Sequence, residues 1–384
     1  MTTAASASSV PLSRLHVPAL DGIRGLAILL VIPHNAGLLL DLPGPMHGAA
    51  YLTRELMQFG WAGVQLFFVL SGFLITGGLL DARGAQGYYS SFYLRRALRI
   101  LPLYVAVLSV TFLLLTPLRL LPHGLLASAH HQIWLWTFLS NWTDPIGWGV
   151  SGFTHFWSLA VEEQFYLLWP LVVLRLEPRR LPALALIVSV ASLGIRTAMR
   201  YAGSPPDYVY EFTVCRMDAL ALGAAAAAML RLPDQQARLR RWSAYLPWVA
   251  LATTGALAPL TRGYTVSGFA TQTVGMSALA VAFTALVLHA AVDQRASPGW
   301  VNRVLSFGAL RSVGKYSYAM YVFHYPLHTL LGVGLIARIT PRPDWRVALL
   351  YVACLTLACY ASALASWYLL ESRFLRLRRY AAAS

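Results

Sequence analysis

Long apolar runs, separated by short polar stretches, are the main feature of the sequence. A helix needs roughly 20 apolar residues to cross the hydrocarbon core of a membrane, and about ten runs approach this length. Their approximate limits are 21–42, 60–80, 100–118, 156–175, 182–201, 213–230, 244–260, 269–291, 314–336 and 346–370. The pattern therefore predicts an all-α polytopic membrane protein with about ten transmembrane helices.

A long segment, residues 119–155, separates the third run from the fourth. It holds prolines, glycines, histidines and tryptophans, and its apolar piece 133–139 is too short to cross a membrane. We expect the segment to lie at the outer interface or to be re-entrant. Its tryptophans would suit stacking on sugar rings, although aromatic residues collect at membrane interfaces without such a role.

Composition supports a membrane protein independently of any motif. The chain is 58% hydrophobic and only 12% charged, whereas soluble domains average about 25% charged residues. Its net charge of +15 would suggest a nucleic-acid partner in a soluble protein. In a membrane protein the same charge indicates topology, because lysines and arginines collect in cytoplasmic loops.

The basic residues divide unequally between alternate loops. Most of them fall in predicted inner segments, such as the stretches 95–99, 238–241 and 373–379. The far fewer basic residues of the predicted outer segments are Arg54, Arg119, Arg200, Arg262, Arg338, Arg342 and Arg346. This asymmetry predicts a multi-pass protein of the inner (plasma) membrane with both termini in the cytoplasm.

The chain is expected to have three parts. They are a flexible cytoplasmic leader over 1–19, a transmembrane domain over 20–372 and a basic cytoplasmic tail over 373–384. The leader is rich in alanine and serine and lacks the basic and apolar regions of a cleaved signal peptide. The three cysteines form no CxxC pair, so we expect neither a metal site nor a disulfide framework.

Arg24 and His34 lie in the first apolar run, where ionisable side chains are costly. An arginine in such a segment costs about 2.5–3.5 kcal/mol on insertion scales. With a rise of roughly 1.5 Å per residue, the two residues are about 15 Å apart along a helix, which suits a site reaching across a bilayer. The alternative is that Arg24 extends to lipid phosphates and His34 packs in the core.

The second and third runs carry further polar residues. Gln65 and Ser71 stand among glycines that allow close helix approach, where such side chains can bond across helices. Arg95, Arg96 and Arg99 cluster just before the third run. Their expected partners are either anionic lipid headgroups or the phosphates of a cytoplasmic cofactor, which guanidinium groups bind bidentately.

Two adjacent carboxylates, Glu162 and Glu163, stand near the start of the fourth run. The helix dipole favours each of them by roughly 0.3–1 kcal/mol. That contribution is small beside the cost of burying a charge, so we expect one of the two to face a polar cavity.

The ninth run carries tyrosines and histidines. Tyr321, His324 and His328 are spaced to share one helix face. An interfacial aromatic belt explains tyrosines at such positions but explains the two histidines poorly. We expect no metal on this face, because no carboxylate or thiolate is close to it in the sequence.

Six stretches together resemble the integral-membrane acyltransferase 3 family, in that family's order and over nearly the whole chain. They are LDGIRGLAILLV (20–31), GVQLFFVLSGFLIT (63–76), FYLRRALRILPLY (92–104), FWSLAVEEQFYLLWP (156–170), GKYSYAMYVFHYPL (314–327) and YLLESRFLRLRR (368–379). The family includes O-antigen, peptidoglycan and Nod-factor O-acetylases and macrolide acyltransferases. The resemblance implies transfer of an acyl group, usually acetyl from cytoplasmic acetyl-CoA, to a hydroxyl of a carbohydrate or similar acceptor.

The resemblance also implies roles for individual residues. His34 matches the family's proposed catalytic histidine, and Arg24 matches the arginine that precedes it. The other matched positions are Arg95, Arg96 and Arg99 for the cytoplasmic arginine motif and Glu162 and Glu163 for the acidic motif.

The first motif departs from the family's usual spacing. Nine residues separate Arg24 from His34, where the family usually has ten. Ten intervening residues bring two side chains back to within about 20° on a helix, whereas nine leave them roughly 80° apart. Pro33 can distort the helix enough to restore the alignment. Asn35 occupies the usual histidine position, and Gln65 replaces a common aspartate.

These matches predict a route for the donor. Acyl-CoA docks from the cytoplasm, and its thin arm passes between the first helices toward His34. His34 acts as a general base toward the acceptor hydroxyl, or it carries the acyl group in a covalent relay. The residues expected to bind the cofactor are Arg24, Ser71, Arg95, Arg96 and Arg99.

The predicted acceptor side lies beyond His34. Glu162 or Glu163 orients the imidazole or binds the acceptor. The residues expected to bind the acceptor are Asn35, Trp157, Tyr318, Tyr321 and His324. A transporter or flippase for a small acid or glycolipid is the alternative, because it would use the same polar residues as a permeation path.

Overall fold

The computed structural model describes residues 17–37, 47–292, 299–332 and 344–377, and these ranges contain helices and no strand. The predicted leader over 1–19 falls mainly outside the described residues, as does most of the predicted tail over 373–384. The far ends of the predicted runs 21–42 and 314–336 also lie outside them. The described part of the protein is therefore all-α, as predicted.

Each predicted apolar run contains a helix. The helices in these runs are α1 (Pro18–Asn35), α3 (Ala62–Asp81), α4 (Tyr88–Ser109), α8 (Trp157–Arg175), α9 (Leu181–Tyr201), α11 (Thr213–Met229), α13 (Leu246–Leu257), α14 (Met276–Val292), α16 (Gly308–Leu327) and α18 (Trp345–Ser366). Four of them continue into a π-helical turn or begin with one, at Val110–Leu115, Thr271–Gly275, His328–Gly332 and Trp367–Glu371.

Shorter helices connect the long ones. They are α2 (Gly48–Phe59), α5 (His123–Ser128), α6 (Ile133–Trp136), α7 (Ser140–Thr143), α10 (Pro206–Glu211), α12 (Pro233–Trp242), α15 (Trp300–Leu305) and α19 (Ser372–Arg376). The segment between α4 and α8 is attached to α8 through Gln164, whose amide donates to Asn141 Oδ1 at 2.8 Å. The start of α4 corrects one predicted boundary, because the helix begins at Tyr88 and not near Ile100.

Six helical segments of the described residues are long and apolar enough to cross a membrane. They are Gly48–Asp81, Tyr88–Leu115, Pro178–Tyr201, Pro206–Met229, Thr271–Val292 and Trp345–Arg376. Helices α1, α8 and α16 are outside this group and carry ionisable side chains, whereas α13 is short at 12 residues. Six segments of this length and apolarity indicate a multi-pass membrane protein.

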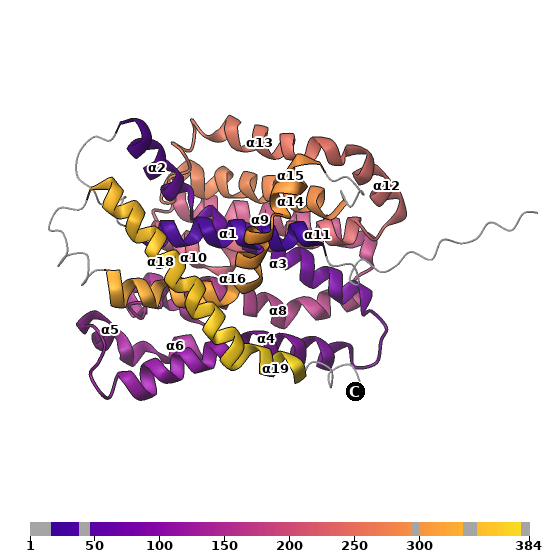
Figure 1. Ribbon diagram of the computed structural model, residues 1–384. Helices are drawn as coiled ribbons and strands as arrows, with labels where there is room; N and C mark the ends of the chain where they lie inside the picture. Colours follow the sequence, from indigo (N-terminus) through magenta and orange to yellow (C-terminus); the bar gives the residue numbers. More distant parts are fainter. Residues whose placement is uncertain (1–16, 38–46, 293–298, 333–343, 378–384) are drawn as a thin grey trace, which may run out of the picture.

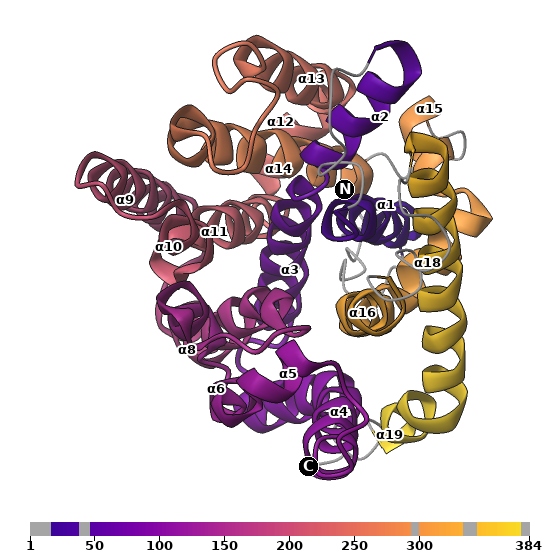
Figure 2. The same ribbon diagram turned by 90° about the vertical axis from the view of Figure 1, so that its left-hand side faces the viewer.

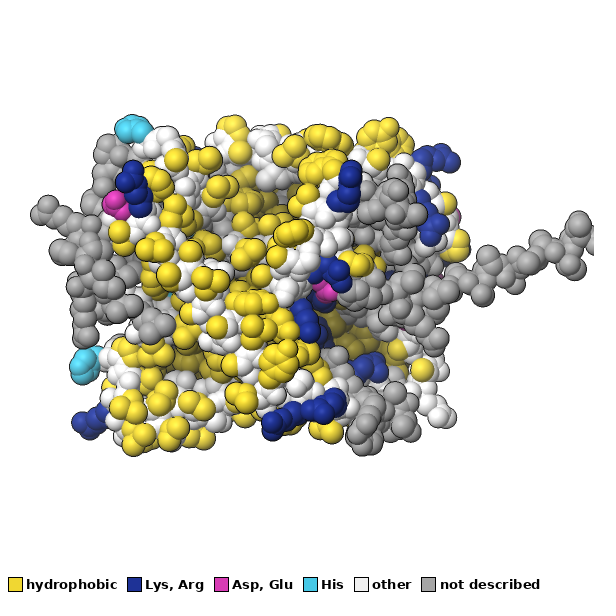
Figure 3. Space-filling model, viewed as in Figure 1, with side chains coloured by type: hydrophobic (Ala, Val, Ile, Leu, Met, Phe, Trp, Pro, Cys, Tyr) yellow, Lys and Arg dark blue, Asp and Glu magenta, His cyan; other side chains and the backbone are white. Residues whose placement is uncertain are grey.

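The long helices lie side by side in one bundle (Figure 1). Helices α1 and α3 occupy its centre, with α16 and α18 on one side and α9 and α11 on the other (Figure 2). On the face drawn in Figure 3, apolar side chains cover most of the bundle and most Lys and Arg side chains lie on its right-hand half.

Glycines on α3 and α11 bring the two backbones into direct contact. A Cβ added to Gly72 would lie 2.0 Å from the carbonyl oxygen of Leu220 on α11. A Cβ added to Gly223 on α11 would lie 2.0 Å from the carbonyl oxygen of Val69. No other residue fits at either position without moving a backbone, so this pair sets the distance between the two helices.

We expect Gly72→Ala to lower the stability of the protein, because the added methyl meets a backbone atom that cannot turn away. Overpacking of this kind costs about 1–3 kcal/mol. Gly78→Ala on the same helix is the matched control, since nothing lies within 4 Å of a Cβ at that position. Thermal unfolding of the purified proteins in detergent should show a lower midpoint for Gly72→Ala alone. Equal midpoints would contradict the assigned contact.

Candidate functional site

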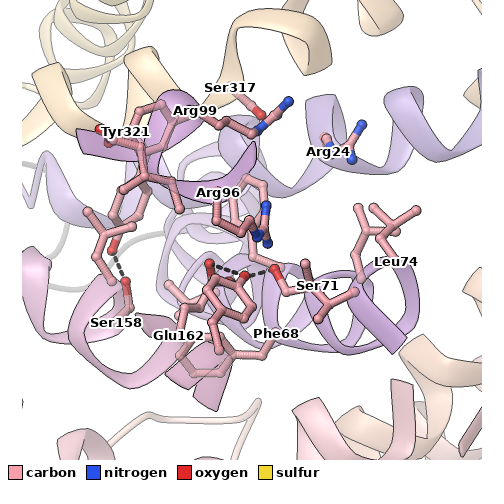
Figure 4. A pocket seen from close by; sticks show the side chains of 18 of the residues that line it. Arg24, Phe68, Ser71, Leu74, Arg96, Arg99, Ser158, Glu162, Ser317 and Tyr321 are labelled. Atoms are coloured by element: carbon pink, nitrogen blue, oxygen red, sulfur yellow. Dashed lines mark hydrogen bonds between the residues drawn. The ribbon is translucent and has the colours of Figure 1, made fainter. Parts of the chain in front are cut away.

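A cavity of about 320 Å³ lies between α1, α3, α4, α8 and α16. Apolar side chains of α3, including Phe67, Phe68 and Leu74, form one wall (Figure 4). The polar residues predicted for the site that line it are Arg24, Ser71, Arg95, Arg96, Arg99, Glu162, Tyr318 and Tyr321. The fold thus brings together polar residues from five helices that are distant in the sequence.

Glu162 is held from two sides. Ser71 Oγ on α3 donates a hydrogen bond to Glu162 Oε1 at 2.7 Å, and the Tyr166 hydroxyl donates one to Oε2 at 2.8 Å. The Arg96 guanidinium stands over the Tyr166 ring, with its Cζ 4.2 Å from the ring centroid. Both carboxylate oxygens are therefore satisfied, which offsets part of the cost of taking the group out of water.

Arginines line much of the rest of the cavity. Arg24 Nη1 forms an ion pair with Asp21 Oδ1 at 2.6 Å within α1. Arg96 and Arg99 are partly buried on α4, whereas Arg95 is exposed. Figure 4 shows Arg24 on the far side of the cavity from Ser158 and Tyr321. Arg96 lies between them, next to Ser71 and Glu162, so the arginines extend from Arg24 to the middle of the cavity and the Ser158–Tyr321 pair lies beyond them (Figure 4).

Hydroxyl groups from α8 and α16 close the second end. The Tyr321 hydroxyl donates to the carbonyl oxygen of His155 at 2.8 Å and lies 2.6 Å from Ser158 Oγ. Tyr318 donates to the carbonyl oxygen of Ile100 at 2.8 Å, which ties α16 to α4. Tyr318 and Tyr321 thus hold α16 against two neighbouring elements while lining the cavity.

Three further polar side chains form a layer next to Tyr321. His324 Nδ1 donates to the Tyr321 carbonyl oxygen at 2.6 Å, which leaves Nε2 to accept from Asn35 Nδ2 at 2.8 Å. The ring of His155 lies 4.7 Å from that of His324, centroid to centroid. Asn35 and His324, both predicted to bind the acceptor, are thus paired with each other and are not among the residues that line the cavity.

His34 faces a different neighbour from Asn35. Its Nδ1 is hydrogen bonded to the carbonyl oxygen of Met57, at 3.1 Å, where α2 ends. A Cβ added to Gly60 would lie 2.8 Å from His34 Cβ, so the side chain sits at the corner between α2 and α3. Asn35, eleven steps after Arg24, is the residue that turns toward α16, as helical periodicity requires. His34 does not line the described cavity.

Glu163 and Trp157 also lie outside the cavity lining. Glu163 is partly buried and close enough to Arg96 for their charges to interact. Trp157 is buried, with its ring centroid 4.9 Å from that of Tyr210 and 5.6 Å from Arg216 Cζ. Trp157 therefore packs beside the buried Arg216 and does not face an open site.

The Arg216 neighbourhood is a buried polar cluster that sequence reasoning did not single out. Arg216 is fully buried and donates through Nη2 to Gln65 Oε1 at 2.7 Å. On the neighbouring helix α9, Arg196 is also fully buried. It donates to Asp218 Oδ2 at 2.8 Å and to Ser277 Oγ at 2.6 Å. The signal was available, because all three charged residues stand inside predicted apolar runs.

His155 is the other residue that sequence reasoning underrated. The sequence marks it only as one of several histidines in the segment before the fourth run. Its position just before the acidic helix would have been the clue.

Among the residues that the structure describes, no three His, Cys, Asp or Glu side chains are grouped to hold a metal ion.

Comparison with known proteins finds one family and several relatives. The family model described as "Acyltransferase domain" matches residues 17–367. Peptidoglycan O-acetyltransferase OatA of Listeria monocytogenes is 29% identical over 359 residues, covering 90% of this chain and 54% of that protein. Putative peptidoglycan O-acetyltransferase YrhL of Bacillus subtilis is 28% identical over 340 residues, covering 82% of this chain and 49% of that protein.

A third relative is similar to the same extent. O-acetyltransferase OatA of Staphylococcus aureus strain NCTC 8325 is 27% identical over 323 residues, covering 81% of this chain and 50% of that protein. The chain therefore spans about half the length of these relatives. No solved structure matches it.

We expect Asp218→Asn to destabilise the fold, because it leaves the Arg196 guanidinium buried without its counter-charge. Breaking a buried ion pair from one side costs about 3–5 kcal/mol. Asp234→Asn is the matched control, since Asp234 is exposed at the start of α12. Thermal unfolding midpoints in detergent provide the measurement. A midpoint for Asp218→Asn as high as that of the control would show that Arg196 does not depend on this carboxylate.

Proposed function

The chain belongs to the acyltransferase domain family, and we propose that it moves an acyl group, acetyl in the simplest case, from acyl-CoA to a hydroxyl of a carbohydrate or glycosylated acceptor. The observation that carries this proposal is the cavity itself, which arginines line from Arg24 to Arg96 and which the Ser158–Tyr321 pair closes beyond them. A donor with phosphates at one end and a thioester at the other matches that polarity. Two relatives are named peptidoglycan O-acetyltransferases, which supports a carbohydrate acceptor.

The proposed topology has ten spans. They are the six apolar segments together with α1, α8, α13 and α16. The ionisable groups of α1 and α8 that line the cavity, Arg24 and Glu162, are turned away from lipid. With both termini in the cytoplasm, the end of the cavity that carries the arginines opens inward, and the segment between α4 and α8 lies outside.

The proposed donor enters from the cytoplasmic end. Arg95, Arg96 and Arg99 bind phosphate oxygens of acyl-CoA, because guanidinium groups form charge-assisted, bidentate bonds with phosphates. The pantetheine arm then extends along the apolar wall of α3, past Ser71, toward Tyr321. Glu162 keeps Ser71 and Tyr166 in position beside this path.

The proposed base is His34, approached by the acceptor from the outer side. The bond from Nδ1 to the Met57 carbonyl assigns the ring proton to Nδ1, so the Nε2 lone pair remains for a hydroxyl. The hydroxyl oxygen attacks the thioester carbonyl, its proton passes to Nε2, and the departing CoA sulfur takes that proton. His34 does not line the cavity, so transfer requires the thioester to pass the layer that Asn35 and His324 form next to Tyr321.

We expect His34→Ala to lower acyl transfer by about 10²–10⁴-fold, the usual contribution of a general base. His130→Ala is the control, since His130 is exposed between α4 and α8. CoA release from acetyl-CoA is measured with purified protein and a soluble peptidoglycan fragment as acceptor. Full activity of His34→Ala would overturn the assignment of the base. A wild-type protein that releases no CoA but moves a solute across vesicles would be a transporter.

The topology has its own test. The background is Cys354→Ala, because the two remaining cysteines are buried. One cysteine at a time is then introduced, by Ala85→Cys between α3 and α4 or by Ser151→Cys between α4 and α8. A membrane-impermeant maleimide should label Ser151→Cys in intact cells and Ala85→Cys only after permeabilisation. Labelling in the reverse order would invert the proposed orientation.

A further inference from the structure

A second cavity, of about 460 Å³, adjoins the first where α1, α4 and α16 meet. Arg24 and Arg99 line both cavities, so the two share a boundary. The second cavity is otherwise lined chiefly by the first half of α16, including Arg311 and Lys315, and by Trp367 after α18. Unlike the first, it is lined mainly by charged and small residues, most of which come from the N-terminal halves of α1 and α16.

The charges of this second cavity are unbalanced. Its ionisable lining consists of Asp21, Arg24, Arg99, Arg311 and Lys315. Asp21 forms its ion pair with Arg24, and it is the one carboxylate in this lining. Arg311 and Lys315 stand four residues apart on α16, where like charges face each other and repel. An anion bound between them would relieve that repulsion.

Lys315 is exposed, and two further observations concern the groups that a ligand in this cavity would meet. Arg311 Nε is buried and has no hydrogen-bond partner among the residues that the structure describes. The Lys315 ammonium lies 4.8 Å from the Trp367 ring centroid. The cavity therefore combines an unsatisfied donor with an aromatic surface beside a cation, which are the groups that recognise a phosphorylated nucleoside.

We propose that the second cavity binds the nucleotide end of acyl-CoA. Arg311 and Lys315 bind its 3′-phosphate, Trp367 contacts the adenine, and Arg24 and Arg99 meet the diphosphate at the boundary of the two cavities. The division matches the shape of the donor, which joins a bulky nucleotide to a thin arm through the diphosphate. This inference rests on the proposed function, and it assigns α16 a role in donor binding that the sequence did not indicate.

The first test measures binding and needs no catalysis. The probe is 3′-phosphoadenosine 5′-phosphate, titrated calorimetrically into the full chain in discs of zwitterionic lipid. We expect adenosine 5′-phosphate to bind at least tenfold more weakly, because it lacks the group that Arg311 and Lys315 contact. Arg311→Gln and Lys315→Gln should each weaken the 3′-phosphorylated ligand about tenfold and leave the other nearly unchanged. Arg373→Gln, exposed on α19, is the matched control.

Three outcomes would overturn the inference. They are equal binding of the two nucleotides by the wild-type protein, equal loss of both in the variants, and no binding of either. A lipid headgroup offers the same phosphate chemistry, so the titration is repeated in discs containing phosphatidylglycerol. Displacement of the nucleotide by this lipid, without preference for the 3′-phosphate, would identify a headgroup site and contradict the proposal.

The second test separates this inference from the proposed function. Transfer is measured with acetyl-CoA and with S-acetyl-4′-phosphopantetheine, which lacks the nucleotide. Arg311→Gln and Lys315→Gln should raise KM for acetyl-CoA about tenfold and leave KM for the truncated donor unchanged. Equal effects on both donors would overturn the nucleotide site while leaving acyl transfer intact. No CoA release by the wild-type protein would overturn the proposed function, and the binding result would still decide the site.

Discussion

The cavity depends on the hydrogen bonds that hold the carboxylate of Glu162. An ionisable group inside a helical membrane bundle must find partners within the protein, because lipid offers none. Ser71 on α3 and Tyr166 on α8 supply them, and Tyr166 in turn supports Arg96 on α4. One carboxylate therefore connects three helices along the wall of the cavity.

Two polar clusters of this protein illustrate opposite solutions to the same constraint. In the cluster of Arg196, Asp218 and Ser277, the arginine and the aspartate are buried and paired with each other. The cluster ties α9, α11 and α14 together and has no capacity for a ligand. The cavities beside Arg24 and Arg99 carry more cations than carboxylates. An excess of positive charge inside a bundle is costly unless it is compensated, and the phosphates of the proposed donor would compensate it.

Helical periodicity explains which neighbours the residues of the first motif contact. Arg24 and Asn35 are eleven steps apart and share a face, whereas His34 is turned by roughly 80° from Arg24. Pro33 lies inside α1, yet Asn35 contacts His324 on α16 and His34 contacts the end of α2. The expected alignment of His34 with Arg24 is therefore not produced by the proline. The short spacing instead divides the motif between two neighbours, and the proposed base works from the α2 side.

The sequence by itself determined the elements, because length and apolarity are local properties. Each predicted run contains a helix. Arg24 and Glu162 were identifiable from their cost in such runs, and Arg96 from the arginine cluster just before the third run. Only the tertiary structure decided which of them meet. The α3–α11 distance depends on Gly72 and Gly223, and the union of Arg24 with Arg311 depends on how α1 packs on α16. Contacts between helices distant in the chain follow from packing, which periodicity within one helix does not encode.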